Sequence, residues 1–322
     1  MYRNVMVPVD GSPFAREAVL QGLRIASRSG AMLRLVRVAA SLPLTSAPDS
    51  AALNVVAGRE TEIAELADLY AIAAECRAHS TVRVTASLER GPVADALIGY
   101  ARRHDVDLIV MRSHNRHGFA RAWFGSVADD LIRKSGIPVL IVRPPSVATG
   151  LADGLGYKRI LVPLDGSPLA EWALEPAISL ARMEDATITL LMVVEEWTER
   201  LPGELESSLG PASVQAVNAA RHYLDTLLRS RADRSLTVVR RVVISSDVES
   251  ALLATAETDE TDLIAIATRG RGGLKRATQG SVSDGILRQS IVSTMVIHPS
   301  LPRIERTEIR SVADEAHATM TA

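Results

Sequence analysis

The feature that most constrains the fold of this chain is an internal repeat of 155 residues in a sequence of 322. The segment VPVDGSP at residues 7–13 returns as VPLDGSP at residues 162–168. Asp107 and Gly125 each begin a short segment, DLI and GSV, that recurs at the same offset. Because all three anchors share one offset, the halves align between them without net insertion. A period this long indicates two copies of a whole domain, since solenoid repeats run to about 20–50 residues.

The repeat predicts two domains, residues 1–146 and 157–300, followed by a flexible tail over residues 301–322. We expect the linker at residues 144–156, PPSVATGLADGLG, because proline, glycine and small residues are common at domain boundaries. Each half is long enough to bury a core of its own.

Short apolar runs alternate with amphipathic segments in each half. In the first half, strands are expected at residues 5–9, 33–38, 81–88, 107–112 and 138–142. In the second half, they are expected at residues 160–164, 188–194, 236–244, 263–268 and 294–298. The helices predicted in the first half are residues 13–29 with Ser12 as N-cap, 60–78 after a loop at 41–58, 92–103 and 124–135. This alternation predicts a parallel sheet covered by helices on both faces.

Composition argues against several classes of protein. The formal net charge is -2, whereas a nucleic-acid-binding domain is usually strongly basic. The single cysteine, Cys76, allows no intramolecular disulfide and is typical of a reducing compartment. The sequence contains no run of about 18 apolar residues and no signal-peptide pattern. We therefore expect a cytoplasmic protein that binds neither nucleic acid nor membrane.

The ends of two strands carry the candidate chemistry, because ligands of open parallel sheets bind at the carboxyl ends of strands. Asp10 and Asp165, each followed by Gly-Ser, come directly after the first strand of each half. Their carboxylates could accept hydrogen bonds from ribose hydroxyls or an adenine edge. They could equally form the turn and cap the next helix, and the sequence leaves both interpretations open.

The turn after the fourth strand of the second half is rich in glycine, with the sequence RGRGG at residues 269–273. Gly280 and Ser281 follow and open a helix, whose N-terminus favours an anion. Exposed N–H groups of the glycines and the charge of Arg269 and Arg271 would complete a cradle for a triphosphate. The alternative is a flexible loop followed by an ordinary serine N-cap.

Other site patterns fail. No P-loop is present, and Lys275 stands where a dinucleotide fingerprint requires glycine. His114 and His117 have no third ligand nearby, so we expect no metal site. No nucleophile elbow and no general base can be assigned, so we expect no efficient catalysis.

The glycine pattern of the second half resembles the ATP-binding motif of universal stress proteins, which is Gly-x-x-Gly, nine residues and then Gly-Ser or Gly-Thr. Ala267 takes the first glycine position, while Gly270, Gly280 and Ser281 match. The runs VPLDGSP, LLMVV and GSVSDGILRQS are similar to the same family, and the resemblance covers both halves. It implies two tandem Rossmann-like α/β domains, each with a five-stranded parallel sheet.

The resemblance also implies a function: binding of ATP, with or without Mg²⁺, in the second domain as part of a stress response. The implied binding residues are Pro163, Leu164, Asp165, Val193, Ile266, Ala267, Arg269, Gly270, Gly280, Ser281, Val282 and Ser283. The alternatives are a nucleotide-independent scaffold and a slow ATPase.

The first half departs from the motif. Arg112 and Asn115 replace the first two glycines, and Ala128 replaces the serine found at 283. An arginine at a position of close approach would put a long side chain where ribose or phosphate should lie. We therefore expect binding in the second half alone. The alternative is that Arg112, His114 and Arg116 bind a phosphate in another pose.

The fifth strands of the two halves, residues 138–142 and 294–298, are short and apolar. Left as exposed sheet edges, they would promote aggregation. In the family that this chain resembles, such strands commonly pair. We expect them to pair within one chain as a pseudo-two-fold dimer, with a homodimer of chains as the alternative.

Replacing Ser281 with alanine should weaken ATP binding while the fold persists. A lost hydrogen bond to a charged group costs about 1.5–3 kcal/mol, which is about tenfold or more in affinity. Titration calorimetry would measure the affinity, and circular dichroism would check the fold. If the variant binds ATP as the parent does, the phosphates do not contact this serine.

Overall fold

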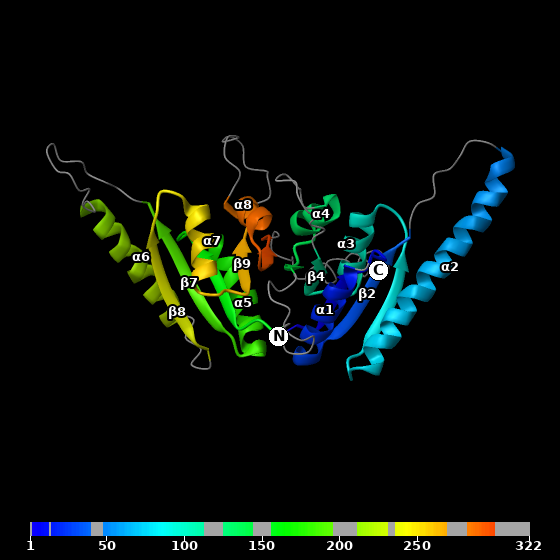
Figure 1. Cartoon of the computed structure of the whole chain (residues 1–322), viewed down its shortest axis with the longest axis horizontal. Helices are drawn as coiled ribbons and strands as arrows, with labels where there is room; N and C mark the ends of the chain where they lie inside the picture. The colour runs from blue at the N-terminus through cyan, green and yellow to red at the C-terminus, as the bar shows by residue number, and fades with distance from the viewer. Residues whose placement is uncertain are drawn as a thin grey trace, which may run out of the picture.

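The computed structural model describes residues 2–12, 14–39, 48–112, 125–143, 156–195, 211–230, 236–268 and 282–299. The strands of the first half are β1 (Asn4–Pro8), β2 (Met32–Val38), β3 (Val84–Glu89), β4 (Leu108–Arg112) and β5 (Val139–Val142). Those of the second half are β6 (Arg159–Leu164), β7 (Thr187–Val194), β8 (Val238–Ile244), β9 (Leu263–Ala267) and β10 (Ser293–Ile297). All ten strands form one sheet, in the order β3-β2-β1-β4-β5-β10-β9-β6-β7-β8 (Figure 1).

Each half contributes five parallel strands in the same order, which confirms the predicted fold class. The chain runs from β1 outward to β2 and β3, then returns to the other side of β1 for β4 and β5. The strand order therefore reverses between β1 and β4, and likewise between β6 and β9. The carboxyl ends of these strands are where open α/β sheets bind their ligands.

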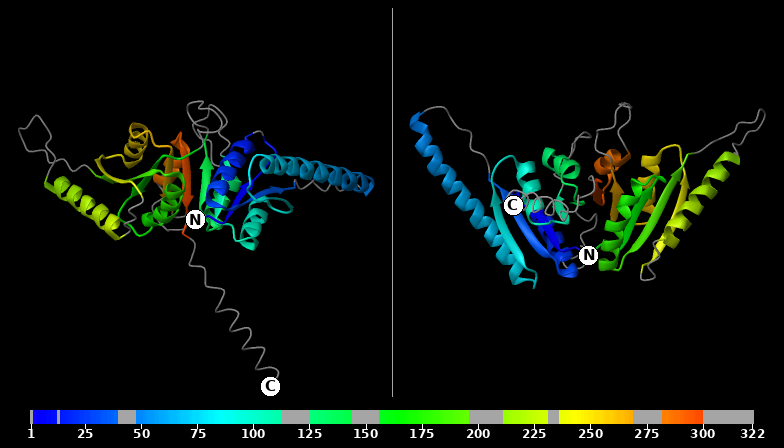
Figure 2. Two further views of the ribbon diagram at one scale, coloured as in Figure 1. Left: turned by 90° about the horizontal axis from the view of Figure 1, so that it is seen from below. Right: turned by 180° about the vertical axis from the view of Figure 1, so that it is seen from behind.

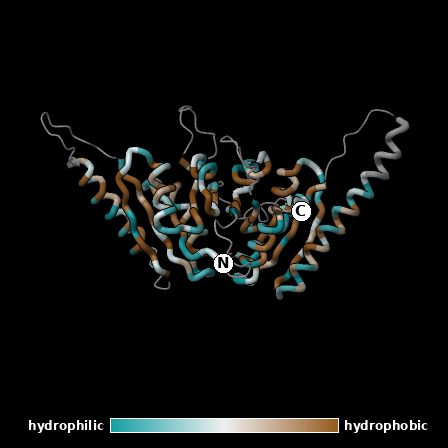
Figure 3. The backbone as a smooth tube through the Cα atoms, viewed as in Figure 1, coloured by the Kyte–Doolittle hydropathy of each residue, from teal (hydrophilic) through white to brown (hydrophobic). Residues whose placement is uncertain are grey.

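Helices cover both faces of the sheet. They are α1 (Ala15–Ser29), α2 (Pro48–Ala78), α3 (Val93–Arg103), α4 (Ser126–Lys134), the 3₁₀ helix η1 (Ala170–Ala173), α5 (Leu174–Glu184), α6 (Pro211–Ser230), α7 (Val248–Thr258) and α8 (Val282–Gln289). One face carries α1, α2, α5 and α6, and the other carries α3, α4, α7 and α8. Figure 2 shows α2 and α6 at opposite ends of the molecule, and Figure 3 shows mainly hydrophobic strands between the helices. No helix in the described ranges is both long and apolar enough to cross a membrane.

Two sequence predictions about helix starts are wrong. The second helix begins at Pro48, within the segment expected as a loop up to residue 58. The sequence does contain a signal for this helix start, because proline and aspartate are favoured in the first turn of a helix. Alanine and leucine then favour its extension. Ser12 does not cap α1, which begins at Ala15 with Phe14 as N-cap. In the second half, by contrast, the hydroxyl of Ser167 does accept from the N–H of Ala170, at 3.2 Å.

The aspartates of the two repeated Asp-Leu-Ile segments have a structural role at the amino ends of the strands. The predicted site lies at the carboxyl ends. The carboxylate of Asp107 accepts the N–H groups of Arg3 and Asn4, at 2.8 and 3.1 Å. Asp262 accepts those of Lys158 and Arg159, at 2.7 and 3.2 Å. Burial raises the pKa of both carboxyls above the ordinary value, which these hydrogen bonds oppose. Each aspartate thus fastens the start of the first strand of its half to the start of the fourth.

The two halves join through β5 and β10, which pair antiparallel and are the strands whose pairing the sequence predicted. The register places Leu140 opposite Met295, with Ile141 opposite Thr294 and Val139 opposite Val296. Leu140 and Met295 are themselves 155 positions apart, so they are equivalent positions of the two copies. A pseudo-two-fold axis therefore passes between them.

The hydrophobic core continues across this joint on both faces of the sheet. On one face, Leu140 and Val142 belong to the same buried cluster as Met295 and Ile297. On the other face, residues of β5 and α4 share a cluster with Leu287 and with Val296 of β10. The boundaries of the two domains stay a prediction, because residues 144–155 and 300–322 lie outside the described part of the chain.

Cleavage of the chain between residues 144 and 156 should leave the halves associated. The joint combines backbone hydrogen bonds with apolar burial on both faces, and it does not depend on the covalent link. A protease site inserted there, followed by gel filtration of the cut protein in dilute solution, would measure the association. Elution as two separate stable monomers would contradict the expectation.

Candidate functional site

The predicted binding residues of the second half that the structure describes lie at the carboxyl edge of its sheet. Pro163 and Leu164 end β6, and Ile266 and Ala267 end β9. Val193 is the next-to-last residue of β7. Because β6 pairs with both β7 and β9, the ends of the three strands are neighbours. The structure thus brings together residues from three separate segments that the sequence could only place at strand ends.

These apolar residues divide between the two faces of the sheet. Val193 and Val282 pack against the buried cluster that contains Ile266, on the face covered by α7 and α8. Leu164 and Ala267 belong to the cluster on the face covered by α5 and α6. The carboxyl ends of these strands therefore form a mainly apolar surface. It lies between the first turn of α8 and the turn after β6.

Asp165 lies in this turn and acts as a turn former. Its Oδ1 accepts the N–H of Ser167 at 2.9 Å, and Gly166 between them has a φ of 79°. Asp10 accepts the N–H of Ser12 in the same way at 2.9 Å, across Gly11 with a φ of 80°. Of the two interpretations that the sequence left open, the structure supports the turn former for both residues. Asp165 is exposed, so its carboxylate still faces solvent.

The start of α8 contributes the last described residue of the predicted site. The hydroxyl of Ser283 donates to the carbonyl oxygen of Ala267, at 3.5 Å. This contact places the first turn of α8 directly beside the end of β9. Four further predicted residues, Arg269, Gly270, Gly280 and Ser281, lie outside the described residues.

In the first half, the end of β4 is occupied by the side chain of its own Arg112. The guanidinium Nη1 of Arg112 donates to Oε1 of Glu17 at 2.5 Å, and its Cζ lies 4.7 Å from the ring centre of Phe14. Only 15% of the Arg112 side chain is exposed. Arg112 thus folds back onto the start of α1 and fills the space beside the strand end. The alternative phosphate pose also involves His114 and Arg116, which lie outside the described residues.

A second arginine, Arg37 of β2, fills the same edge and was missed by the sequence analysis. Its side chain is 6% exposed. Its Nε donates to the carbonyl of Val9 at 3.2 Å, Nη1 to that of Glu65 at 3.1 Å and Nη2 to Asp68 at 2.7 Å. The guanidinium therefore lies over the turn after β1 and ties it to α2.

The second half differs at four positions that are equivalent to side chains of this network. At the offset of 155, Met192 stands for Arg37, Ala267 for Arg112, Leu169 for Phe14 and Trp172 for Glu17. None of these four residues is charged, and the side chain of Trp172 is about half exposed. Alignment of the two halves would have shown the change at Arg37, because an arginine inside the apolar strand LRLVRV has methionine as its counterpart.

Other features of the described residues give no competing site. No group of three or more His, Cys, Asp or Glu residues in these ranges could bind a metal ion. Cys76 is buried, and burial raises its pKa, which disfavours the reactive thiolate. A hollow of about 540 Å³ lies between α2 and β3, far along the sheet from the strand ends of the second half. Among its charged residues, Glu62 pairs with Arg90, and Glu89 pairs with Arg103.

Comparison with known proteins identifies the family. The universal stress protein family matches residues 1–143 and 156–298, so the chain belongs to this family and carries two copies of its domain. The universal stress protein Rv1996 of Mycobacterium tuberculosis is 25% identical over 329 residues, which cover 93% of this chain and 97% of the relative.

Solved structures agree with this fold. A universal stress protein from Archaeoglobus fulgidus superposes with a TM-score of 0.67 at 19% identity, covering 92% of this chain and 98% of its own. A putative universal stress protein from Pseudomonas aeruginosa gives a TM-score of 0.60 at 16% identity, covering 92% and 94%. At these identities the likeness supports the fold alone.

Replacing Arg37 with methionine, the residue of the second half, should destabilise the first half. The carbonyl of Val9 would lose its buried side-chain donor, and an unsatisfied buried group costs about 1–3 kcal/mol. Urea unfolding followed by circular dichroism would measure the change. Arg90→Met is the matched control, because Arg90 also pairs with a carboxylate but its side chain is 74% exposed. Equal stability of both variants would contradict the expectation.

Proposed function

We propose that the protein binds an adenine nucleotide, ATP, in its second domain and acts in a cytoplasmic stress response without efficient catalysis. Membership of the universal stress protein family supports the general role. The motif formed by Ala267, Gly270, Gly280 and Ser281 supports the choice of ligand and of domain. Mg²⁺ could accompany the nucleotide through its phosphates, since this proposal needs no protein ligand to the metal.

The single observation that carries the proposal is a difference between the two halves in the side chains at the carboxyl ends of their strands. In the first half, Arg37 and Arg112 fill the edge and are held there by Asp68 and Glu17. In the second half, small or apolar side chains stand at the same positions, and Ala267 ends β9 without a long side chain. A nucleotide can therefore approach the backbone of the second half, whereas in the first half it would have to displace two arginines that are mostly buried and paired with carboxylates.

The described strand ends support binding more than chemistry. Asp165 is the carboxylate in the turn after β6, and its Oδ1 accepts the N–H of Ser167. The hydroxyl of Ser283 donates to a main-chain carbonyl, which does not activate it as a nucleophile. Steady release of ADP from saturating ATP would favour the slow ATPase instead.

The first experiment is to ask what the purified protein carries. Mass spectrometry of the denatured protein should detect adenine nucleotide, and calorimetry with ATP on stripped protein should give about one site per chain, as one open cradle predicts. Two equal sites would remove the distinction between the halves. No bound nucleotide and no heat of binding would favour a nucleotide-independent scaffold.

Replacing Ala267 with arginine should make the end of β9 resemble the end of β4, where Arg112 stands at the equivalent position. We expect ATP affinity to fall at least about tenfold, which corresponds to about 1.4 kcal/mol, because the side chain would occupy the end of β9. Ala254→Arg on the exposed side of α7 is the matched control and should leave the affinity unchanged. Calorimetry on both variants decides, and equal affinities would place the nucleotide elsewhere.

A further inference from the structure

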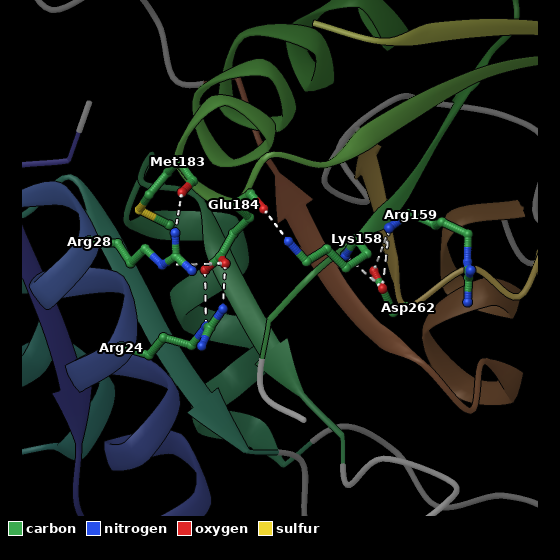
Figure 4. Close-up of polar contacts among 7 residues, drawn as sticks. All are labelled: Arg24, Arg28, Lys158, Arg159, Met183, Glu184 and Asp262. Carbon is green, nitrogen blue, oxygen red and sulfur yellow. Dashed lines mark hydrogen bonds and ion pairs between the residues drawn. The ribbon is translucent and has the colours of Figure 1, made fainter. Parts of the chain in front are cut away.

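A buried ion pair joins the two halves beside the β5–β10 joint. Glu184, the last residue of α5, has a side chain that is fully buried. Its Oε1 accepts from Nε of Arg24 at 3.2 Å and its Oε2 from Nη2 at 2.7 Å. Figure 4 shows Arg24 and Arg28 reaching from α1 towards this carboxylate, with Nε of Arg28 at 3.9 Å from Oε2. The contact is therefore bidentate, shielded from water and made between the halves.

The backbone around this pair is part of the same interface. Nζ of Lys158 donates to the main-chain carbonyl of Glu184 at 2.8 Å, and Nη1 of Arg28 donates to that of Met183 at 3.4 Å. Gly156 lies against the guanidinium of Arg24, where a Cβ would collide with it. The end of α5 and the segment that leads into β6 are thus shaped around the ion pair.

The internal repeat shows that this pair has no counterpart across the pseudo-two-fold axis. At the offset of 155, Arg24 corresponds to Ser179 and Glu184 corresponds to Ser29. Both counterparts are uncharged, and the hydroxyl of Ser29 donates to the carbonyl of Ile25 in its own helix at 2.7 Å. The ion pair therefore lies on one side of a joint whose backbone is symmetric.

The backbone by itself would not choose between partners. β5 and β10 are both short and apolar, and the axis passes between the equivalent residues Leu140 and Met295. Two first halves, or two second halves, from different chains would present the same kind of edge to each other. A symmetric surface of this kind can pair with a copy of itself.

The charges oppose these like pairings. If two second halves met through this interface, each Glu184 would face Ser179 of the other chain, and its buried carboxylate would lose both arginines that contact it. If two first halves met, each Arg24 would face Ser29. An ion that is buried without its partner is strongly unfavourable, whereas the unlike pairing matches each charge.

We infer that Arg24 and Glu184 determine which halves pair, so that this face is an interaction surface specific for the unlike half of the chain. The first half accepts a second half, from its own chain or from another copy, and rejects another first half. Each chain has two apolar edge strands that can pair. Specificity of this kind prevents chains from linking into open assemblies through pairs of first halves and pairs of second halves.

The test uses two full-length variants with opposite charge changes. In Arg24→Glu, both facing groups are acidic, and in Glu184→Arg, both are basic, so neither chain can match charges within itself. Mixed together, the first half of each variant matches the second half of the other, which gives a reciprocal dimer of chains. We expect native mass spectrometry of the co-refolded mixture to show this mixed dimer in large excess over the assemblies of either variant alone. The double variant R24E/E184R should behave as the parent protein.

Controls separate pairing from folding. Arg16→Glu and Glu175→Arg change charge on the exposed sides of the same two helices and should give no mixed dimer. If either single variant fails to fold alone, circular dichroism should show recovery on co-refolding with the other. A statistical mixture of assemblies, no recovery on co-refolding, or a double variant that stays unlike the parent would each overturn the inference.

Discussion

The structure depends on the antiparallel pairing of β5 with β10, which turns two five-stranded sheets into one. Each of these strands would otherwise be an open edge with unpaired backbone groups and an apolar surface. Their pairing satisfies those groups and lets buried clusters continue across the joint on both faces of the sheet. The free edges that remain belong to β3 and β8, at opposite ends of the molecule and beside the long helices α2 and α6 (Figure 1).

The backbone is close to symmetric, but the side chains are not, and this difference underlies both proposals. At the joint, Arg24 and Glu184 face each other on one side of the axis, while serines occupy the equivalent positions. At the carboxyl edges, Arg37 and Arg112 fill the first half, while methionine and alanine leave the second half without these groups. The two halves therefore share one backbone frame but differ in the side chains at the carboxyl ends of their strands.

Much of the fold could be predicted because hydrophobic periodicity and the repeat are properties of the sequence. All ten strands appear close to where short apolar runs placed them, since such runs are buried by a parallel sheet whatever the details of packing. The start of α2 differs from the sequence prediction of a loop over residues 41–58, although Pro48 and Asp49 are typical of a helix N-terminus. The predicted site residues of β6, β7 and β9 lie at or near the ends of these strands, and their division between two faces of the sheet follows only from the strand pairing.

The sequence by itself determined that the chain contains two copies of one α/β domain, which edge strands need a partner, and which half keeps the glycine pattern. Those conclusions depend on local pattern and on the offset of 155, which need no coordinates. Only the tertiary structure decided that Arg37 and Arg112 fold back onto their own half, that Asp165 forms a turn, and that Arg24 meets Glu184. A long side chain can reach partners in several directions, and the partner it contacts is fixed by residues far away in the sequence. Arg24 and Glu184 are 160 positions apart, and the pairing of two sheets brings them together.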